Sequence, residues 1–166
     1  MKWLLFFPFI LQAVCIVFDE GYFHLKRGLP RFECIGHPLD TLTVIACLAF
    51  SLILPFSQVT FMGFIFLALF SCFFVTKDEF VHLKHCEAKE MWLHALLFIN
   101  HPILLSSLII LWLHEQHVIS WFELDTRFIS QFIMMQTVFA SAFFLYQVIY
   151  WNFIRKPLET LNENDQ

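Results

Sequence analysis

Long apolar runs, separated by short polar segments, restrict what this chain can fold into. Hydrophobic residues make up 59% of its 166 residues, and charged residues only 14%. A helix of about 20 apolar residues crosses the hydrocarbon core of a bilayer and satisfies its own backbone hydrogen bonds. We therefore expect an all-α integral membrane protein whose partner is the lipid bilayer. The net charge of −4, with no basic run, excludes nucleic acid as an expected partner.

The apolar runs predict five transmembrane helices, at residues 3–18, 39–55, 59–76, 90–113 and 128–154. Residues 1–154 should form one membrane domain, followed by a polar tail at 155–166. The first run resembles a secretory signal, but no small-residue cleavage site follows it before Asp19, so we expect a retained helix. The turn signal Gly28-Leu29-Pro30 should separate the first helix from the second.

Two polar segments, residues 19–37 and 78–94, share one pattern: adjacent acidic residues, then His-Leu-Lys, then Glu with His four residues later. Residues 1–56 and 57–113 thus look like two copies of one helical hairpin, and residues 128–154 form a fifth helix outside the repeat. An even number of crossings per copy predicts parallel hairpins related by an axis along the membrane normal. Both polar segments should then meet at one membrane surface.

The basic residues predict the orientation. With five crossings, eight of the ten Lys and Arg residues fall on the side of the polar segments, and only Lys2 and Arg127 fall on the other. The positive-inside rule places the polar segments and the C-terminus in the cytoplasm, and the N-terminus outside. The expected location is an inner or plasma membrane.

Pairs of an acidic residue and a histidine four positions later are enriched in the polar segments. Four such pairs occur, whereas random placement of 14 acidic residues and 8 His would give about 0.7. Residues so spaced lie on one face of a helix and can bind one cation together. The metal ligands that we predict are Glu20, His24, Glu33, His37, Glu79, His82, Glu90 and His94.

The acidic ligand of the second segment has two candidates. Asp78 lies four residues before His82, whereas alignment of the segments makes Glu79 the counterpart of Glu20. We favour Glu79, because a longer carboxylate bridges metal ions more easily. Asp78, and Glu87 if it is not simply solvated, then become candidates for a catalytic base.

Other polar residues near these segments have simpler interpretations. Asp40 follows His37 by three residues and is a candidate to orient its ring. His101 should be a buried histidine that hydrogen-bonds to a neighbouring helix, with a ligand or a proton relay as the alternative. The five cysteines favour no disulfide framework, and Cys34 and Cys86 within the segments are expected to be small buried residues rather than ligands. We expect His114 and His117 to be a surface pair.

Four carboxylates and four imidazoles approach the ligand set of dinuclear centres in helical bundles, and they suit iron, zinc or manganese better than copper(I). We therefore expect two divalent metal ions, with iron favoured, in a membrane enzyme that oxidises a lipid-like or hydrophobic substrate. A zinc-dependent hydrolase is the alternative. Transport or sensing of a divalent ion, or a non-enzymatic membrane subunit whose polar segments form salt bridges, are further alternatives.

Overall fold

A computed structural model describes residues 2–78 and 86–155, which form helices and connecting loops with no strand among them. Five helical stretches in these residues are long and apolar enough to cross a membrane, which confirms the predicted number of hydrophobic helices. They are Lys2–Arg27, Arg31–Ile53, Gln58–Asp78, Ala88–Glu115 and Thr126–Ile154.

Several stretches combine more than one kind of helix. The first contains η1 (Lys2–Leu5), α1 (Phe7–Phe18), the π turn η2 (Asp19–His24) and α2 (Leu25–Arg27). The second is α3 (Arg31–Ile53), and the third contains α4 (Gln58–Phe74) and η3 (Val75–Asp78). The last two are α6 (Ala88–Glu115), and α7 (Thr126–Ile149) with the π turn η4 (Tyr150–Ile154).

The residues of the first polar segment continue the helices instead of forming a long loop. The helices predicted at 3–18 and 39–55 were too short at their polar ends, since the structure continues them to Arg27 and starts the second at Arg31. The predicted turn between them is confirmed. Gly28 has a φ of 80°, a conformation that disfavours a side chain, and its N–H bonds to the carbonyl oxygen of His24 at 2.8 Å.

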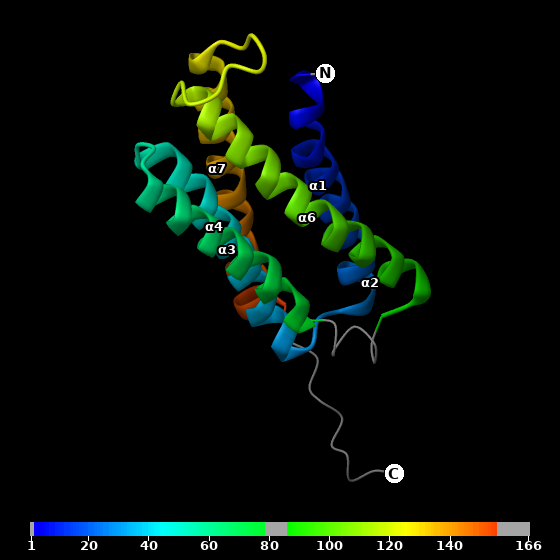
Figure 1. Cartoon of the computed structure of the whole chain (residues 1–166). Coiled ribbons are helices and arrows are strands. Elements are labelled where there is room, and N and C mark those ends of the chain that lie inside the picture. Colours follow the sequence, from blue (N-terminus) through cyan, green and yellow to red (C-terminus); the bar gives the residue numbers. More distant parts are fainter. Residues whose placement is uncertain (1, 79–85, 156–166) are drawn as a thin grey trace, which may run out of the picture.

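The helices form a bundle with two distinct ends (Figure 1). α1 packs chiefly against α6, and α3 packs chiefly against α7 and α4. One end carries the N-terminus and the α3–α4 and α6–α7 connections, and the other carries η2, α2, the start of α3 and the start of α6. The described parts of both polar segments therefore lie at the end opposite the N-terminus.

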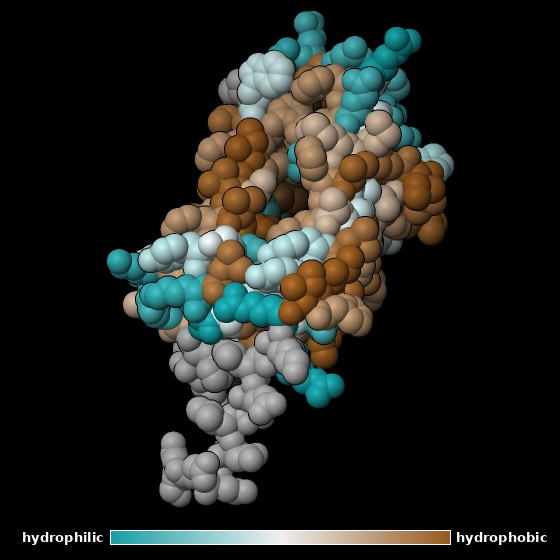
Figure 2. All heavy atoms as spheres, turned by 180° about the vertical axis from the view of Figure 1, so that it is seen from behind, coloured by the Kyte–Doolittle hydropathy of each residue, from teal (hydrophilic) through white to brown (hydrophobic). Residues whose placement is uncertain are grey.

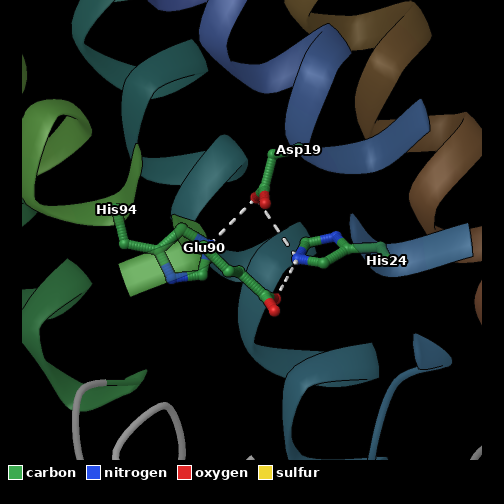
Figure 3. Close-up of side chains that lie close together, drawn as sticks. All are labelled: Asp19, His24, Glu90 and His94. Carbon is green, nitrogen blue, oxygen red and sulfur yellow. Dashed lines mark hydrogen bonds and ion pairs between the residues drawn. The ribbon is translucent and has the colours of Figure 1, made fainter. Parts of the chain in front are cut away.

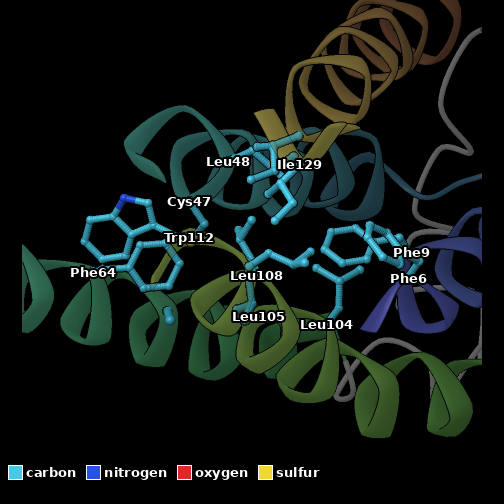
Figure 4. Close-up of a cluster of buried hydrophobic side chains, with 13 residues drawn as sticks. Phe6, Phe9, Cys47, Leu48, Phe64, Leu104, Leu105, Leu108, Trp112 and Ile129 are labelled. Carbon is cyan, nitrogen blue, oxygen red and sulfur yellow. The ribbon is translucent and has the colours of Figure 1, made fainter. Parts of the chain in front are cut away.

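A dry apolar core fills the bundle between the polar cluster and the N-terminal end (Figure 4). Phe64 of α4 stacks on Trp112 of α6 with ring centroids 5.5 Å apart, and both side chains are fully buried. The outer surface is also apolar, since Val59 is 82% exposed and Phe73 79% exposed. A bundle that is apolar outside as well as inside matches a hydrocarbon solvent better than water.

One expectation about the connection between α6 and α7 is wrong. His114 is not a surface residue, because it is buried and its two ring nitrogens each lie 3.2 Å from a backbone carbonyl oxygen, those of Ile119 and Leu124. His117, with a φ of 58°, forms the turn instead. The histidine therefore folds this connection back onto the end of α6.

Candidate metal centre

The two polar segments meet through buried side chains (Figure 3). Asp19 Oδ2 lies 3.2 Å from His24 Nε2 and 3.1 Å from His94 Nε2, so one carboxylate joins α6 to η2. Glu90 Oε1 approaches His24 Nε2 to 3.9 Å from the other side. All four residues are at most 6% exposed, and their ligand atoms lie within 4.8 Å of one another.

The π turn η2 explains why Asp19 takes part. In an α-helix, residues five positions apart point in different directions, because 3.6 residues complete a turn. The i→i+5 pattern of a π turn widens the helix, so Asp19 and His24 both face the same point. Acid–histidine pairs at i,i+4 predicted Glu20 there, and Asp19 was missed because no residue pattern signals this change of helical period.

Arg27 is a second residue that the sequence analysis missed. Its Nη2 lies 2.8 Å from Glu33 Oε2 and 2.9 Å from Glu90 Oε1, and its Nε donates a further bond to Glu90. Glu33 and Glu90 are 0% and 1% exposed, so Arg27 balances two carboxylates that have little access to water. Two of the predicted ligands thus already share a cationic partner supplied by the protein.

Lys77 has the same role on the opposite side of the cluster. Its ammonium lies 2.7 Å from both oxygens of Asp40 and 3.1 Å from Asp78 Oδ1. Asp78 Oδ2 lies 3.4 Å from His37 Nδ1, so this carboxylate joins η3 to α3. Asp40, a predicted partner of His37, instead pairs with Lys77.

Gly36 permits this close approach. A Cβ at position 36 would lie 2.9 Å from Asp78 Oδ1 and 3.3 Å from Lys77 Cε, closer than such atoms normally come. The missing side chain therefore lets η3 sit against α3 and places Asp78 within reach of His37.

Glu20 lies on the far side of His24 from Asp19. Its Oε2 is 3.0 Å from His24 Nδ1, while its Oε1 accepts the indole N–H of Trp151, and Tyr146 forms a further hydrogen bond. A histidine that binds a metal through one nitrogen commonly donates from the other to a carboxylate. Glu20 thus suits the orientation of His24 better than direct ligation, and α7 takes part in the site although the repeat did not include it.

The remaining predicted residues lie in different places. Glu79 and His82 lie outside the described residues. Glu87 is not brought into the cluster, since its side chain is 65% exposed and pairs with Lys26 at 3.2 Å. His37 stacks on His24 with ring centroids 5.0 Å apart, and its Nε2 lies 3.9 Å from Glu33 Oε2.

Cys34 and His101 follow the simpler interpretations. Cys34 is fully buried and its thiol donates to the carbonyl oxygen of Leu29. Cys86 is only partly buried, and burial raises the pKa of its thiol well above the usual range. His101 is buried and its Nε2 lies 3.0 Å from the hydroxyl of Ser71, which confirms a histidine hydrogen-bonded to a neighbouring helix.

A cavity of about 120 Å³ opens against the cluster. Its polar wall includes Asp19, His24, His37, Asp78 and His94, and its remaining wall comes from α1, α3, α6 and α7. Asp19 Oδ1 is buried with no hydrogen-bond partner among the described residues. The same carboxylate that joins His24 to His94 therefore has one oxygen that is free to accept a hydrogen bond or to bind a cation.

Among the described residues, three overlapping groups have the composition and spacing of a metal site. They are Asp19–His24–Glu90–His94, His24–Glu33–His37 and His37–Asp40–Asp78. Atoms that bind one ion at about 2.0–2.2 Å lie roughly 3 Å apart at neighbouring positions, and the contacts of Asp19 with His24 and His94 have this spacing. Lys77 already pairs with Asp40 and Asp78 of the third group. Arg27 pairs with Glu33 of the second group and with Glu90 of the first. Asp19, His24 and His94 of the first group are therefore the ligands that best fit an ion.

Comparison of the chain with models of known protein families, with characterised proteins and with solved structures finds no match.

Proposed function

We propose that this chain is a membrane-embedded metalloenzyme, which binds two divalent metal ions in the buried cluster and oxidises a lipid-like substrate. The observation that carries the proposal is an imbalance of charge. Six carboxylates meet in the cluster, whereas the only permanent cations within reach in the described residues are Arg27 and Lys77. The six carboxylates are Asp19, Glu20, Glu33, Asp40, Asp78 and Glu90.

Six negative and two positive side chains leave an excess of four negative charges when all six carboxylates are ionised, and two divalent cations would balance it. Buried charges without partners cost several kcal/mol each, so this excess must be balanced. Proton uptake is the competing explanation: His24, His37 and His94 supply at most three positive charges, and the buried carboxylates can take up further protons themselves. Metal binding accounts for the imidazoles as well, since their nitrogens and the carboxylate oxygens converge on common points.

The donor set favours iron. Asp19, His24 and His94 supply two imidazoles and one carboxylate, the set that holds non-haem iron and leaves further coordination positions open. All three side chains line the cavity, so the open positions would face a substrate. Iron held by these three residues would supply the activation of dioxygen. The balanced reaction turns RH, dioxygen, two electrons and two protons into ROH and water, with the electrons supplied by a separate electron-transfer donor.

Metal analysis of the detergent-purified chain tests the proposal. The chain is loaded with Fe²⁺ without oxygen, passed through a desalting column and assayed by elemental analysis. We expect close to two ions per chain for the wild type, and a loss of at least one for His94→Ala and for the isosteric Asp19→Asn. His117→Ala, which changes a histidine at the other end of the bundle, is the matched control and should bind as the wild type does.

Three results would count against the proposal. Wild-type protein that is folded by circular dichroism but retains no metal would show that protons balance the cluster. Equal retention by Asp19→Asn and the wild type would remove Asp19 from the site. Preferential retention of Zn²⁺ from an equimolar mixture, without oxygen consumption in the iron-loaded form, would replace oxidation by metal-dependent hydrolysis.

A further inference from the structure

We infer that the substrate enters this site sideways from the bilayer, between α1 and α7, and that it presents the interior of a hydrocarbon chain rather than its head group. This inference rests on the proposed function, because it names the substrate class of the same site. Three observations carry it: the place where α1 and α7 separate, the depth of that opening, and the combination of apolar walls with an ionic cluster in the cavity.

The first and the last span touch near both ends of the cavity. Toward the N-terminal end, Phe6 and Phe9 pack on Phe132 with ring centroids 4.7 and 5.1 Å apart. At the polar end, Trp151 of η4 donates to Glu20 of η2. Between these contacts the cavity is lined by two residues of α1 and two of α7, namely Gln12, Ile16, Phe143 and Gln147. A view of this face shows a hollow flanked by apolar side chains with hydrophilic ones beside it (Figure 2).

The opening lies deep relative to the polar end of the bundle. Ile16 precedes Arg27, the end of the first span, by eleven residues, and Phe143 precedes Ile154, the end of the last span, by the same number. At 1.5 Å per residue, both lie about 16 Å from their helix ends. The head-group region is only about 5–8 Å thick on each side of a hydrocarbon core of about 30 Å, so the opening faces acyl chains.

The cavity combines apolar walls with an ionic cluster. Ile16, Phe98 and Phe143 form walls that suit methylene groups, and Asp19 and His94 belong to the ionic cluster. Neutral amide and hydroxyl groups and a further imidazole complete the lining, those of Gln12, Thr41, Gln147 and His101. A charged head group would find no charge partner on the walls formed by Ile16, Phe98 and Phe143, whereas a hydrocarbon segment needs none. The geometry thus places a carbon from the interior of a lipid chain, and not the ester or the phosphate, beside the candidate ion.

Photolabelling in vesicles tests the inference. The full chain is reconstituted in phosphatidylcholine vesicles containing a phosphatidylcholine with a diazirine at mid-chain, or one with a diazirine on the head group. We expect the mid-chain probe to label peptides around Ile16 and Phe143, and Ile16→Trp to reduce this labelling at least fivefold. The matched control is Val17→Trp, which alters the neighbouring residue, 70% exposed on the outer surface, and should label as the wild type does.

A second variant protects the test against misfolding. Phe143→Ala removes a cavity wall and should increase mid-chain labelling of Ile16. Equal labelling of Ile16→Trp and the wild type, or stronger labelling of the cavity by the head-group probe, would overturn the inference. Metal content measured on the same samples separates the two proposals: mid-chain labelling without bound metal refutes the metalloenzyme and keeps the lipid site, whereas bound metal without labelling does the reverse.

Discussion

The buried carboxylates of this bundle have two kinds of partner, and the contrast bears on where the proposed metal ions would bind. Glu33 and Glu90 share Arg27, and Asp40 and Asp78 share Lys77, so a permanent cation tied to the backbone lies beside each pair. Within the described part of the chain, the ion-pair partners of Asp19 are instead imidazoles, those of His24 and His94.

The two kinds of partner differ in whether the positive charge can be replaced by a metal ion. A guanidinium keeps its proton at any physiological pH and cannot leave its site. An imidazole can give up its proton and bind a metal through the same nitrogen. The Arg27 and Lys77 regions therefore act as fixed supports, and the region around Asp19 is the part of the cluster that can take up an ion. Removing members of each region in turn tests this division.

The largest effect is expected from Arg27→Met. This change keeps much of the side-chain volume but leaves Glu33 and Glu90 buried without their shared cation. Breaking a buried ion pair costs about 3–5 kcal/mol, so the free energy of unfolding in detergent should fall by about that amount. Lys26→Met is the matched control, because Lys26 forms only an exposed pair with Glu87 and its loss should leave the unfolding transition unchanged. Equal stability of the two variants would show that Arg27 does not stabilise the polar end of the bundle.

A smaller effect on stability, but a large one on metal affinity, is expected from Trp151→Phe. A phenyl ring replaces the indole, so the N–H that Glu20 accepts is lost together with some buried ring volume, and the unpaired carboxylate alone should cost about 1–3 kcal/mol. Because Glu20 in turn orients His24, metal affinity should fall by about 10–100-fold in a competition titration. Trp121→Phe changes a tryptophan that is 74% exposed and serves as the control. Unchanged affinity in Trp151→Phe would mean that Glu20 does not position the ligand.

Gly36→Ala tests the Lys77 region by steric means. The new Cβ would press on Asp78 Oδ1 and Lys77 Cε, and overpacking of this kind costs about 1–3 kcal/mol. A Cβ at Gly21 meets nothing within 4 Å, so Gly21→Ala is the matched control. We expect a lower melting temperature for Gly36→Ala only, with metal content retained. Loss of metal from Gly36→Ala would show that Asp78 belongs to the exchangeable region instead.

The sequence predicted much of the fold and a part of the site. Apolar runs depend on composition over about 20 residues, a signal that tertiary contacts do not alter, so five hydrophobic helices were predictable. Periodicity at i,i+4 found His24, Glu33, His37, Glu90 and His94, and the structure places these side chains at one end of the bundle.

The missed residues share a physical reason. Asp19 reaches the site because a π turn changes the helical period, and nothing in the spacing of a single sequence shows where such a turn occurs. Arg27 and Trp151 act across 63 and 131 residues of chain, and such pairings are set by packing rather than by local pattern. The acidic and histidine residues were visible as a pattern, and their partners were not.

The smallest loss of stability is expected from removing a hydrogen bond between two neutral side chains. The Thr41 hydroxyl lies 2.7 Å from Gln147 Oε1 and ties α3 to α7 beside the cavity. Thr41→Val removes this bond between neutral groups and should cost about 1 kcal/mol, less than any change to a charged support. Thr76→Val is the control, because the Thr76 hydroxyl bonds only within its own helical segment, to the carbonyl oxygen of Phe73. Metal content should stay at the wild-type level in both variants. A loss of stability from Thr41→Val as large as that from Arg27→Met would mean that the docking of α3 on α7, and not charge neutralisation, holds the polar end together.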